Sequence, residues 1–389
     1  MEKVAEVSVP VGPDEVVIKE GLVSVVMPRS GLGSTKHGPS RSAPVFLNPA
    51  MELARDITVA VFPLLGDRFR KRVLDGLAGT GIRGLRIARE APGAWGEVTL
   101  NDRNPLAFKA IQRNIALNGQ DPATVRATKC HASSLLIEES FTYIDLDPYG
   151  TPVPFIDAAI QSSVKSVLAV TATDSAALTG SSPETCLRRY GARPQKCHYL
   201  QEAGLRTLIG FIVRHAARYD KAATPLLSTA TDYYMRTYIL LWDGAARAKE
   251  SIMKLGHTTL NKDGSITTQT FADGAEHLPS KASKAWGPLW TGPLHDAELV
   301  KKLKVPAHSN NKKALEKMFE HFRGEANLMP MFYDMDEMAR IYRHNPPKLE
   351  TVLAGIREKG FKASRSSISP KGFKTDMPFD ELVAFWNEV

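Results

Sequence analysis

The sequence is poor in cysteine and contains no long apolar run. Among its 389 residues there are three cysteines, Cys130, Cys186 and Cys197, whose spacing fits neither paired metal ligands nor an even set of disulfides. We therefore expect buried thiols, a reducing compartment and no structural metal. No apolar segment approaches the length of a membrane span, and the first residues lack the apolar core of a signal peptide. These absences predict a soluble, cytoplasmic protein without membrane contact.

Acidic residues are fewer than basic ones, with 42 Asp and Glu against 50 Lys and Arg. The resulting isoelectric point of about 9.2 is typical of a protein with a polyanionic partner. A solvated basic surface explains the same balance, so charge alone leaves both interpretations open. A hydrophobic content of 43% is sufficient for a folded protein, and the length predicts two or three domains.

One short segment, Phe141-Thr-Tyr-Ile-Asp-Leu-Asp-Pro-Tyr-Gly150, has the features of a ligand site. A buried-strand pattern leads directly into Asp147, and ligands of open α/β sheets bind beyond the carboxyl ends of the strands. Pro148 stiffens the turn, and Tyr149 offers a flat ring. Asp147 and the Pro148 carbonyl can accept both N–H groups of a nucleobase amine while Tyr149 stacks on the base. An ordinary strand-to-helix turn uses the same residue types and is the alternative.

A glycine-rich turn follows the strand predicted at residues 71–75. The stretch Gly79-Thr-Gly-Ile-Arg-Gly84 matches the G-x-G-x-x-G pattern, which lets a nucleotide approach the backbone closely. The pattern is shared by nicotinamide, flavin and S-adenosylmethionine sites, so it does not identify the cofactor. The next strand, at residues 97–102, ends in Asp102, which is therefore expected to bind ribose hydroxyls.

The third strand, near residues 125–131, runs into Ala132-Ser-Ser134. Many nucleotide sites carry an acid at this point to read the adenine amine. Here the sequence offers serine hydroxyls or backbone groups instead. We therefore assign Ser133 and Ser134 to the cofactor site.

Two residues that precede the glycine turn in the sequence, Phe46 and Arg55, are further candidates for the ligand site. Asn48-Pro49 predicts the start of a helix, whose apolar stripe recurs between residues 53 and 61. Arg55 points away from that stripe and is free to meet a carboxylate. Phe46, just before the cap, is either a hydrophobic staple or an exposed aromatic, and the pattern alone favours the staple.

The N-terminal part reads as two short strands within residues 14–27, followed by a Gly- and Ser-rich segment over residues 29–42. We expect this segment to be flexible without a ligand. It either folds over an anionic ligand or is a solvated linker.

The remaining cations and aromatics suggest RNA contact. Beyond residue 250 the doubly wound pattern stops, and helices at 335–342 and 347–359 precede a basic β-ribbon at 361–375, as in a winged helix. A helical dimerisation module and a solvated basic surface are the alternatives. The candidate RNA-binding residues are Arg188, Arg189, Tyr233, Arg236, Arg365, Lys371 and Lys374.

Taken together, the motifs resemble the tRNA guanine-N2-dimethyltransferases, which act on the guanosine at tRNA position 26. The similarity spans residues 14–389. It rests on Phe46-Leu-Asn-Pro-x-Met51, Ala78-Gly-Thr-Gly-Ile-Arg-Gly84, Asp145-Leu-Asp-Pro-Tyr-Gly150, Thr171-Ala-Thr-Asp174, Cys186-Leu-Arg-Arg-Tyr190 and Gly287-Pro-Leu-Trp-Thr-Gly-Pro293.

The resemblance implies an α/β fold with two domains. Residues 1–250 would form a Rossmann-like class I S-adenosylmethionine methyltransferase domain, beginning with a hairpin and flexible linker over 1–42. Residues 251–389 would form a smaller α+β domain with a winged-helix-like end that binds tRNA. The implied reaction transfers methyl groups from S-adenosylmethionine to N2 of guanosine 26, giving N2-methyl- and N2,N2-dimethylguanosine. Another nucleic-acid amino-methyltransferase and, less readily, a nicotinamide oxidoreductase remain as alternatives, and we expect a monomer.

The resemblance also assigns residues to roles. Asp147 would fix the guanine amine, with Pro148 beside it, while Phe46 and Tyr149 sandwich the base. The implied cofactor-binding residues are Arg55 at the methionine carboxylate, Asp75, Gly79, Gly81, Arg83, Asp102 at the ribose, Ser133 and Ser134. The sequence departs from the family twice, since Ala132-Ser133 stands where an acid beside the adenine is common and Tyr149 replaces the commoner phenylalanine. A four-cysteine zinc site, which some relatives carry, cannot form here.

Overall fold

The computed structural model describes residues 10–33, 43, 45–91, 93, 95–162, 165–275, 277, 284–343 and 345–388. By their contacts, the residues form two compact units. Unit 1 comprises Met1–Thr171, Leu240–Trp242 and Leu303–Glu316, and unit 2 comprises Ala172–Ile239, Asp243–Lys302 and Lys317–Val389. The predicted domains, 1–250 and 251–389, do not coincide with these units. The reason is that the chain after Thr171 packs with the C-terminal part, as helix α8 (Leu200–Ala217) does with strand β12 (Ala285–Trp290).

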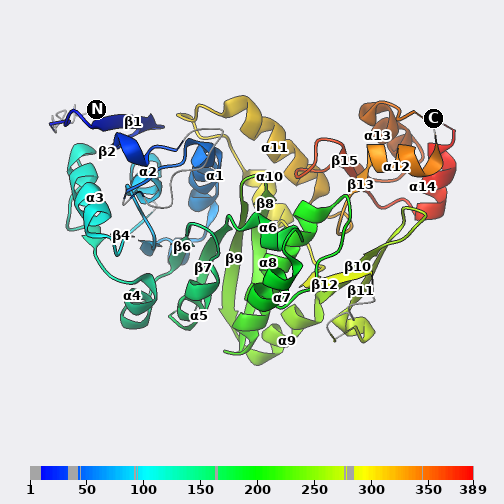
Figure 1. Cartoon of the computed structure of the whole chain (residues 1–389), viewed down its shortest axis with the longest axis horizontal. Helices are drawn as coiled ribbons and strands as arrows, with labels where there is room; N and C mark the ends of the chain where they lie inside the picture. The colour runs from blue at the N-terminus through cyan, green and yellow to red at the C-terminus, as the bar shows by residue number, and fades with distance from the viewer. Residues whose placement is uncertain are drawn as a thin grey trace. The chain divides into compact units, whose positions relative to one another are not determined.

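A parallel sheet forms the core of unit 1 (Figure 1). Its strands are β3 (Arg72–Asp75), β4 (Glu97–Asn101), β5 (Val125–Thr128), β6 (Tyr143–Leu146) and β7 (Lys165–Ala172), in the spatial order β5-β4-β3-β6-β7. Unit 2 contains β8 (Lys221–Ala230) and most of β9 (Met235–Asp243). Every residue of β6 is buried, as expected for a parallel sheet covered on both faces. The register of β3 and β6 sets Asp75 opposite Asp145. The predicted Rossmann-like sheet is confirmed.

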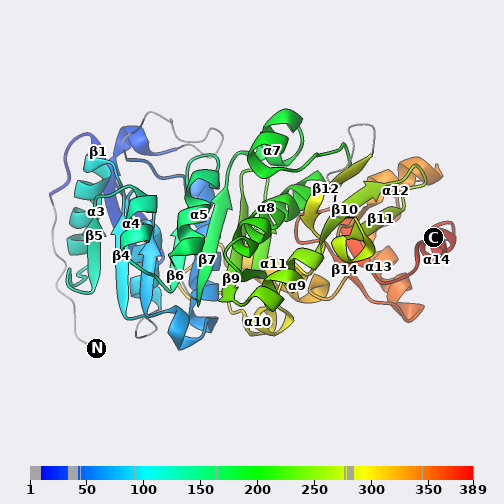
Figure 2. The same cartoon turned by 90° about the horizontal axis from the view of Figure 1, so that it is seen from below.

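Helices join the parallel strands, as crossover connections require (Figures 1 and 2). They are α2 (Ile82–Glu90), α3 (Pro105–Leu117), α4 (Ala132–Glu138) and α5 (Val153–Gln161), and α1 (Glu52–Val61) precedes them. Asn104 caps α3 by accepting the N–H of Leu106 at 2.9 Å. Asn48 caps the 3₁₀ turn η2 (Pro49–Met51), which leads into α1, in the same way. The predicted Asn-Pro starts are thus confirmed.

An antiparallel hairpin, β1 (Glu15–Glu20) and β2 (Val23–Pro28), precedes the sheet and confirms the two predicted N-terminal strands. Asn114 of α3 and Asn118, which caps the C-terminal end of α3, each accept a backbone N–H of β2, at 2.8 and 3.0 Å, and so fasten the hairpin to this helix. Further short 3₁₀ turns are η1 (Arg29–Gly31), η3 (Phe62–Leu64), η4 (Asp67–Phe69) and η5 (Phe271–Asp273). Residues 34–42 of the predicted flexible linker lie outside the described residues.

Unit 2 is built around α8, whose residues from Glu202 to Val213 are all buried. A helix buried on every side needs close neighbours, and a Cβ at Gly210 would lie only 3.2 Å from the backbone of Leu289 in β12, tighter than most Cβ contacts. The antiparallel sheet β11-β10-β12 includes β10 (Leu255–Leu260) and β11 (Ile266–Thr270). The remaining helices of this part are α6 (Ser175–Leu178), α7 (Pro183–Tyr190), α9 (Ala245–Met253) and α10 (Ala297–Lys302).

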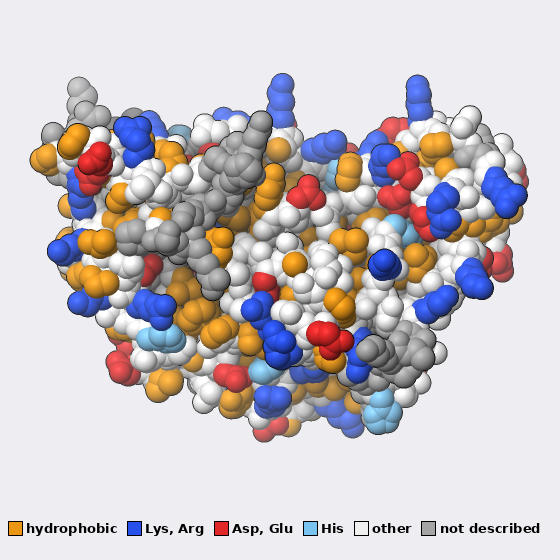
Figure 3. All heavy atoms as spheres, viewed as in Figure 1, with side chains coloured by type: hydrophobic (Ala, Val, Ile, Leu, Met, Phe, Trp, Pro, Cys, Tyr) orange, Lys and Arg blue, Asp and Glu red, His pale blue; other side chains and the backbone are white. Residues whose placement is uncertain are grey.

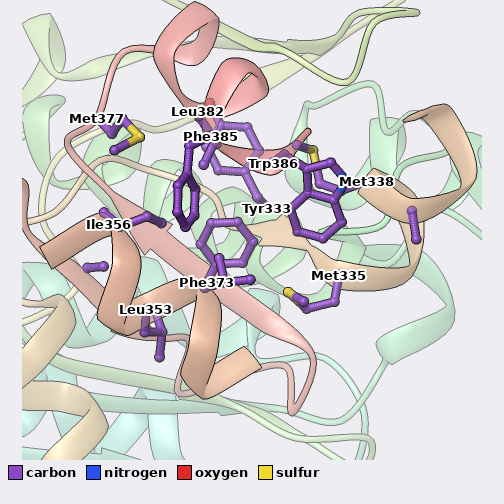
Figure 4. Packing of buried hydrophobic residues seen from close by; sticks show 13 residues of the cluster. Tyr333, Met335, Met338, Leu353, Ile356, Phe373, Met377, Leu382, Phe385 and Trp386 are labelled. Carbon is purple, nitrogen blue, oxygen red and sulfur yellow. The ribbon is translucent and has the colours of Figure 1, made fainter. Parts of the chain in front are cut away.

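The chain ends in a small module with the element order of a winged helix. The order is α11 (Lys312–Glu325), β13 (Tyr333–Asp334), α12 (Met335–Tyr342), α13 (Leu349–Glu358), β14 (Ala363–Arg365) and β15 (Gly372–Thr375), followed by α14 (Phe379–Trp386). The strands form the antiparallel sheet β13-β15-β14. Figure 4 shows its hydrophobic core, in which Tyr333, Phe373 and Trp386 come together from three elements. The predicted winged-helix-like end is confirmed.

Candidate active site

A cavity of about 530 Å³ opens in unit 1 beyond the carboxyl ends of four parallel strands. It is lined by Gly79 after β3, Asp102 after β4, His131 after β5 and Asp147 after β6. Phe46, Tyr149 and Phe155 add aromatic surface to its walls. Loops beyond the ends of parallel strands are the usual ligand-binding edge of such sheets. The fold therefore brings together the principal motifs found in the sequence.

The glycine turn holds the carboxylate of Asp102 in place. Gly79 and Gly81 have φ values of +56° and +82°, a left-handed conformation that other residues rarely adopt. The N–H of Gly79 donates to Asp102 Oδ2 at 3.0 Å, and the N–H of Asn104 donates to Oδ1 at 2.9 Å. Burial raises the pKa of Asp102, and these two hydrogen bonds oppose that rise. Asp102 is thus a fixed acceptor at the cavity wall.

Asp147 is held from behind by a buried arginine. Arg83, which is 4% exposed and begins the first turn of α2, forms an ion pair with Asp147. The same guanidinium donates to Thr58 Oγ1 at 3.0 Å, and its Nε lies 3.5 Å from Asp145 Oδ1. The Asp147 side chain is 21% exposed, so it still reaches the cavity. Arg83 does not line the cavity among the described residues and acts on it through Asp147.

Two further acids lie beneath the cavity. Asp75 accepts the N–H of Gly84 at 3.1 Å, and Asp145 accepts the hydroxyl of Tyr143 at 3.0 Å. Burial raises the pKa of Asp75 to about 7, and the nearby negative charge of Asp145 adds to the rise. Arg83 opposes it. Asp75 is therefore poised to change its protonation near neutral pH.

The two aromatic residues predicted to sandwich a base are in edge-to-face contact. The ring centroids of Phe46 and Tyr149 are 6.0 Å apart, and the ring planes are inclined at 89°. Tyr149 is 50% exposed, whereas Pro148 between it and Asp147 is buried. Both rings line the same cavity, but their faces are not parallel. A stacked base therefore requires one ring to turn.

Arg55 is not at the cavity. It is 5% exposed, and its Nε donates to Glu20 Oε2 at 2.7 Å. The hairpin β1–β2 brings Glu20 against α1, and the sequence pattern gave no means of placing it there. Arg55 does bind a carboxylate, but this carboxylate is the side chain of Glu20 and not the methionine carboxylate of a cofactor.

The two serines predicted to bind the cofactor do not line the cavity. Ser134 is exposed, and the Ser133 hydroxyl lies 3.5 Å from the carbonyl of Pro154. The cavity is lined instead by His131, Ala132 and Arg103, of which sequence reasoning missed His131 and Arg103. Arg103 follows β4 and His131 follows β5, and these positions were the sequence signal that could have identified both residues.

Two predicted RNA-binding residues are corrected by their burial. Arg236 is fully buried and donates to the hydroxyl of Tyr238 at 2.9 Å. Lys374 is 2% exposed, and its Nζ lies 2.8 Å from Glu202 and 3.6 Å from Glu325. Neither side chain can reach a nucleic acid, because each is enclosed with its own partners.

The other predicted RNA-binding residues are more accessible. Arg188 is exposed, and Tyr233 is 55% exposed. Arg189 pairs with Asp174 at 3.1 Å. In the winged-helix module, Arg365 pairs with Glu350 and Lys371 with Asp336. Figure 3 shows Lys and Arg side chains spread over the visible face among acidic ones, without a single large basic patch.

No helix among the described residues is long and apolar enough to cross a bilayer. Within the same part of the chain, no group of His, Cys, Asp and Glu is arranged to hold a metal ion. The three cysteines are free, with Cys186 buried and the other two partly so. Burial raises the pKa of Cys186 and of Cys197 to about 12, so neither is a reactive thiolate at neutral pH.

The chain is similar to known proteins over almost its whole length. The family model described as N2,N2-dimethylguanosine tRNA methyltransferase matches residues 31–387. A tRNA (guanine(26)-N(2))-dimethyltransferase of Thermococcus kodakarensis is 38% identical over 96% of this chain and 99% of that protein. The enzyme of the same name from Pyrococcus horikoshii is 34% identical over 94% of this chain and 96% of its own length. The structure of Trm1 from Pyrococcus horikoshii with S-adenosyl-L-methionine matches with a TM-score of 0.83 and 32% identity, covering 95% of this chain and 99% of that one.

Proposed function

Since the chain belongs to the N2,N2-dimethylguanosine tRNA methyltransferase family, we propose that the cavity at the ends of β3–β6 is its active site. The protein is an S-adenosylmethionine-dependent tRNA (guanine-N2)-dimethyltransferase. It transfers methyl groups to N2 of guanosine 26 in tRNA, giving N2-methyl- and N2,N2-dimethylguanosine. The observation that carries the site assignment is the meeting of Asp102 and Asp147, from two strand ends, in one cavity.

The cavity fits S-adenosylmethionine. Its volume of about 530 Å³ lies within the usual range for small-molecule sites, roughly 300–1,000 Å³. Asp102, fixed by two backbone N–H groups, would accept from the ribose hydroxyls. The left-handed Gly79 carries no side chain and lines the cavity, so its backbone could contact the methionine part. When bound, S-adenosylmethionine supplies a methyl group on a positively charged sulfur, where it is open to attack.

Asp147 would orient the guanine amine. The lone pair of an exocyclic amine is delocalised into the ring, so the amine is a weak nucleophile until it is held. Asp147 and the carbonyl of Pro148 can accept its two N–H groups and so direct the lone pair toward the methyl group. Arg83 and Thr58 keep the carboxylate from rotating. The contribution of these residues is therefore orientation, and no covalent intermediate with the protein is needed.

Phe46 and Tyr149 would hold the base between them. The target nucleotide lies within the stacked body of a tRNA, so it must leave its stack at a cost of a few kcal/mol. Stacking on two rings offsets part of that cost. The perpendicular contact now seen between the rings would be exchanged for two parallel contacts with the guanine.

The C-terminal domain would hold the rest of the tRNA. We assign this role to residues 251–389, with Arg365 and Lys371 of the winged-helix module as phosphate contacts, and Arg188, Arg189 and Tyr233 as further contacts. Their exposure, complete or partial, supports the assignment. We also propose that the protein acts as a monomer in the cytoplasm.

The test is nucleoside mass spectrometry of one unmodified tRNA after incubation with the protein and S-adenosylmethionine. We expect N2-methyl- and then N2,N2-dimethylguanosine, and neither product from the same tRNA carrying adenosine at position 26. Ribosomal RNA serves as the second control. Methylation of ribosomal RNA in preference to tRNA would contradict the assignment of substrate.

A further inference from the structure

The cavity has one end that the proposed chemistry leaves unassigned. The strand order is β5-β4-β3-β6, so Asp102, after β4, lies between His131, after β5, and Asp147, after β6. On the proposed function, on which this inference rests, the ribose is at Asp102 and the methyl group faces Asp147. The adenine of the cofactor must then extend toward His131.

This end presents an aromatic wall suited to a flat ring. The His131 imidazole and the Phe155 ring come from different elements, the start of α4 and the first turn of α5. Their centroids are 5.9 Å apart, with the planes inclined at 32°. Rings at this separation cannot enclose a purine between them, because each aromatic pair needs about 4.5 Å or more between its centroids. They form one continuous wall instead, against which a purine can lie.

Most of the polar groups near this end already have partners. Both carboxylate oxygens of Asp102 accept backbone N–H groups, and the proposed function assigns their remaining acceptor capacity to the ribose. Asn104 Oδ1 accepts the N–H of Leu106. The carbonyl of Cys130 accepts from Asn101 at 3.1 Å. In contrast, the ring nitrogens of His131 have no hydrogen-bond partner among the described residues, although the residue is exposed to the cavity.

The chemistry of the imidazole matches that of adenine. Adenine presents an amine, N6, which needs an acceptor. A neutral imidazole has one acceptor nitrogen and one donor nitrogen. Arg103, which also lines this end, carries donors only. His131 is thus the side chain here with an uncommitted acceptor.

We propose that His131 recognises the adenine of the cofactor by accepting a hydrogen bond from N6, while Phe155 packs against the purine. The hydroxyls of Ser133 and Ser134 have no part in this recognition. His131 is then the residue by which the protein distinguishes an adenosyl cofactor from one with a different base.

The experiment compares two ligands that differ at one group. Titration calorimetry would measure S-adenosylhomocysteine and its analogue with an unsubstituted purine, in which a hydrogen replaces the N6 amine. We expect the wild-type protein to prefer the adenosyl ligand by about threefold to tenfold, the effect of one net hydrogen bond. His131→Ala should lower the affinity for the adenosyl ligand by that factor and leave the unsubstituted purine ligand nearly unchanged, so that the preference disappears.

Two variants separate recognition from packing. Phe155→Leu should weaken both ligands by the same factor, because stacking does not depend on N6. Ser134→Ala, at an exposed neighbouring position, should change neither. The melting temperature of each variant, measured without ligand, shows that the fold is intact.

The outcomes also distinguish this inference from the proposed function. If the wild-type protein binds neither ligand, the assignment of the cavity to the cofactor fails. If it binds the adenosyl ligand and His131→Ala keeps the full preference, or if the wild-type protein has no preference, the role of His131 is overturned while the proposed function stands.

Discussion

Arg83 and Asp147 form an ion pair across two elements, the first turn of α2 and the turn that follows β6. Arg83 follows the glycine turn in sequence, so the segment that shapes the proposed cofactor side of the cavity also fixes the carboxylate on the proposed substrate side. Thr58 of α1 completes the arrangement by accepting from the same guanidinium at 3.0 Å. Three elements therefore determine where the Asp147 oxygens lie.

Replacing Arg83 should impair methyl transfer more than cofactor binding. Arg83→Lys keeps a positive charge but cannot reach Asp147 and Thr58 at once, because an ammonium lacks the planar fork of a guanidinium. We expect kcat to fall at least tenfold while the dissociation constant of S-adenosylhomocysteine changes less than threefold, an orientation effect. Single-turnover kinetics and titration calorimetry measure the two quantities.

The control for this prediction is Lys109→Ala, on the exposed face of α3. It should leave both quantities unchanged. Arg83→Gln should go further and lower the free energy of unfolding by about 3–5 kcal/mol, since it leaves buried Asp145 without its cation. Equal losses of cofactor binding and turnover in Arg83→Lys would mean that Arg83 acts on the cofactor and not through Asp147.

Asp147→Asn should bind the cofactor normally and transfer methyl groups poorly. Arg83 would take the single oxygen of the amide, so the NH2 group would face the guanine amine, which needs an acceptor and would no longer be held in line. We expect single-turnover transfer to fall by about 10²-fold or more, the effect of losing one preorganised polar contact. Glu138→Gln, an exposed carboxylate of α4, is the matched control. Near-normal transfer by Asp147→Asn would remove this residue from the mechanism.

The local motifs of the site were predictable because each depends on a few neighbouring residues. Asp102 and Asp147 each follow a strand directly, Gly79 lies in the turn after β3, and parallel strands bring their carboxyl ends to one edge. The Asn-Pro helix starts are equally local. For these features, position in the sequence was sufficient to give position in the fold.

Tertiary pairing was not predictable in the same way. Arg55 is occupied by Glu20 because a hairpin far from it in sequence packs onto its helix. Lys374 is buried, although cations are usually exposed, because it meets Glu202 from a helix far from it in sequence. The same holds for His131, whose neighbour Phe155 lies on the next helix.

The stability of the protein should depend on the protonation of Asp75. Because the folded protein holds the Asp75 pKa near 7, above the unfolded value of 3.8, the folded state binds more protons than the unfolded state between these values. The contribution of Asp75 to stability is therefore fully present at low pH and is lost as pH rises from about 4 to about 7. The loss amounts to at most about 1.4 kcal/mol per pH unit.

Asp75→Asn should remove this dependence, since an amide does not ionise and can still accept the N–H of Gly84. Urea denaturation of both proteins at pH 5 and pH 8 tests it. We expect the free energy of unfolding of the variant, minus that of the wild type, to be larger at pH 8 than at pH 5. A constant difference between the two proteins at the two pH values would show that Asp75 does not titrate in this range.

Lys374 and Lys371 lie close together in the β-ribbon and should give opposite results on substitution. Lys374→Met leaves Glu202 and Glu325 buried without their shared ammonium, and the Arg206 guanidinium and the His295 imidazole are the partners that remain beside them. An uncompensated buried charge costs about 3–5 kcal/mol, so the free energy of unfolding should fall by that amount. Lys371, exposed and paired with Asp336, should tolerate Lys371→Ala with its stability nearly unchanged.

Substitution of the two lysines should affect tRNA binding in the opposite way, with the larger effect at Lys371. If Lys371 contacts a phosphate, Lys371→Ala should weaken tRNA binding and reduce the slope of log affinity against log salt by about one, because one fewer counterion is released. Folded Lys374→Met, measured at a temperature well below its melting point, should keep the wild-type slope, since the buried ammonium releases no counterion from RNA. Filter binding at several salt concentrations gives both slopes. A reduced slope for Lys374→Met with the wild-type slope for Lys371→Ala would reverse the assignment, because it would require the buried lysine to reach the phosphates.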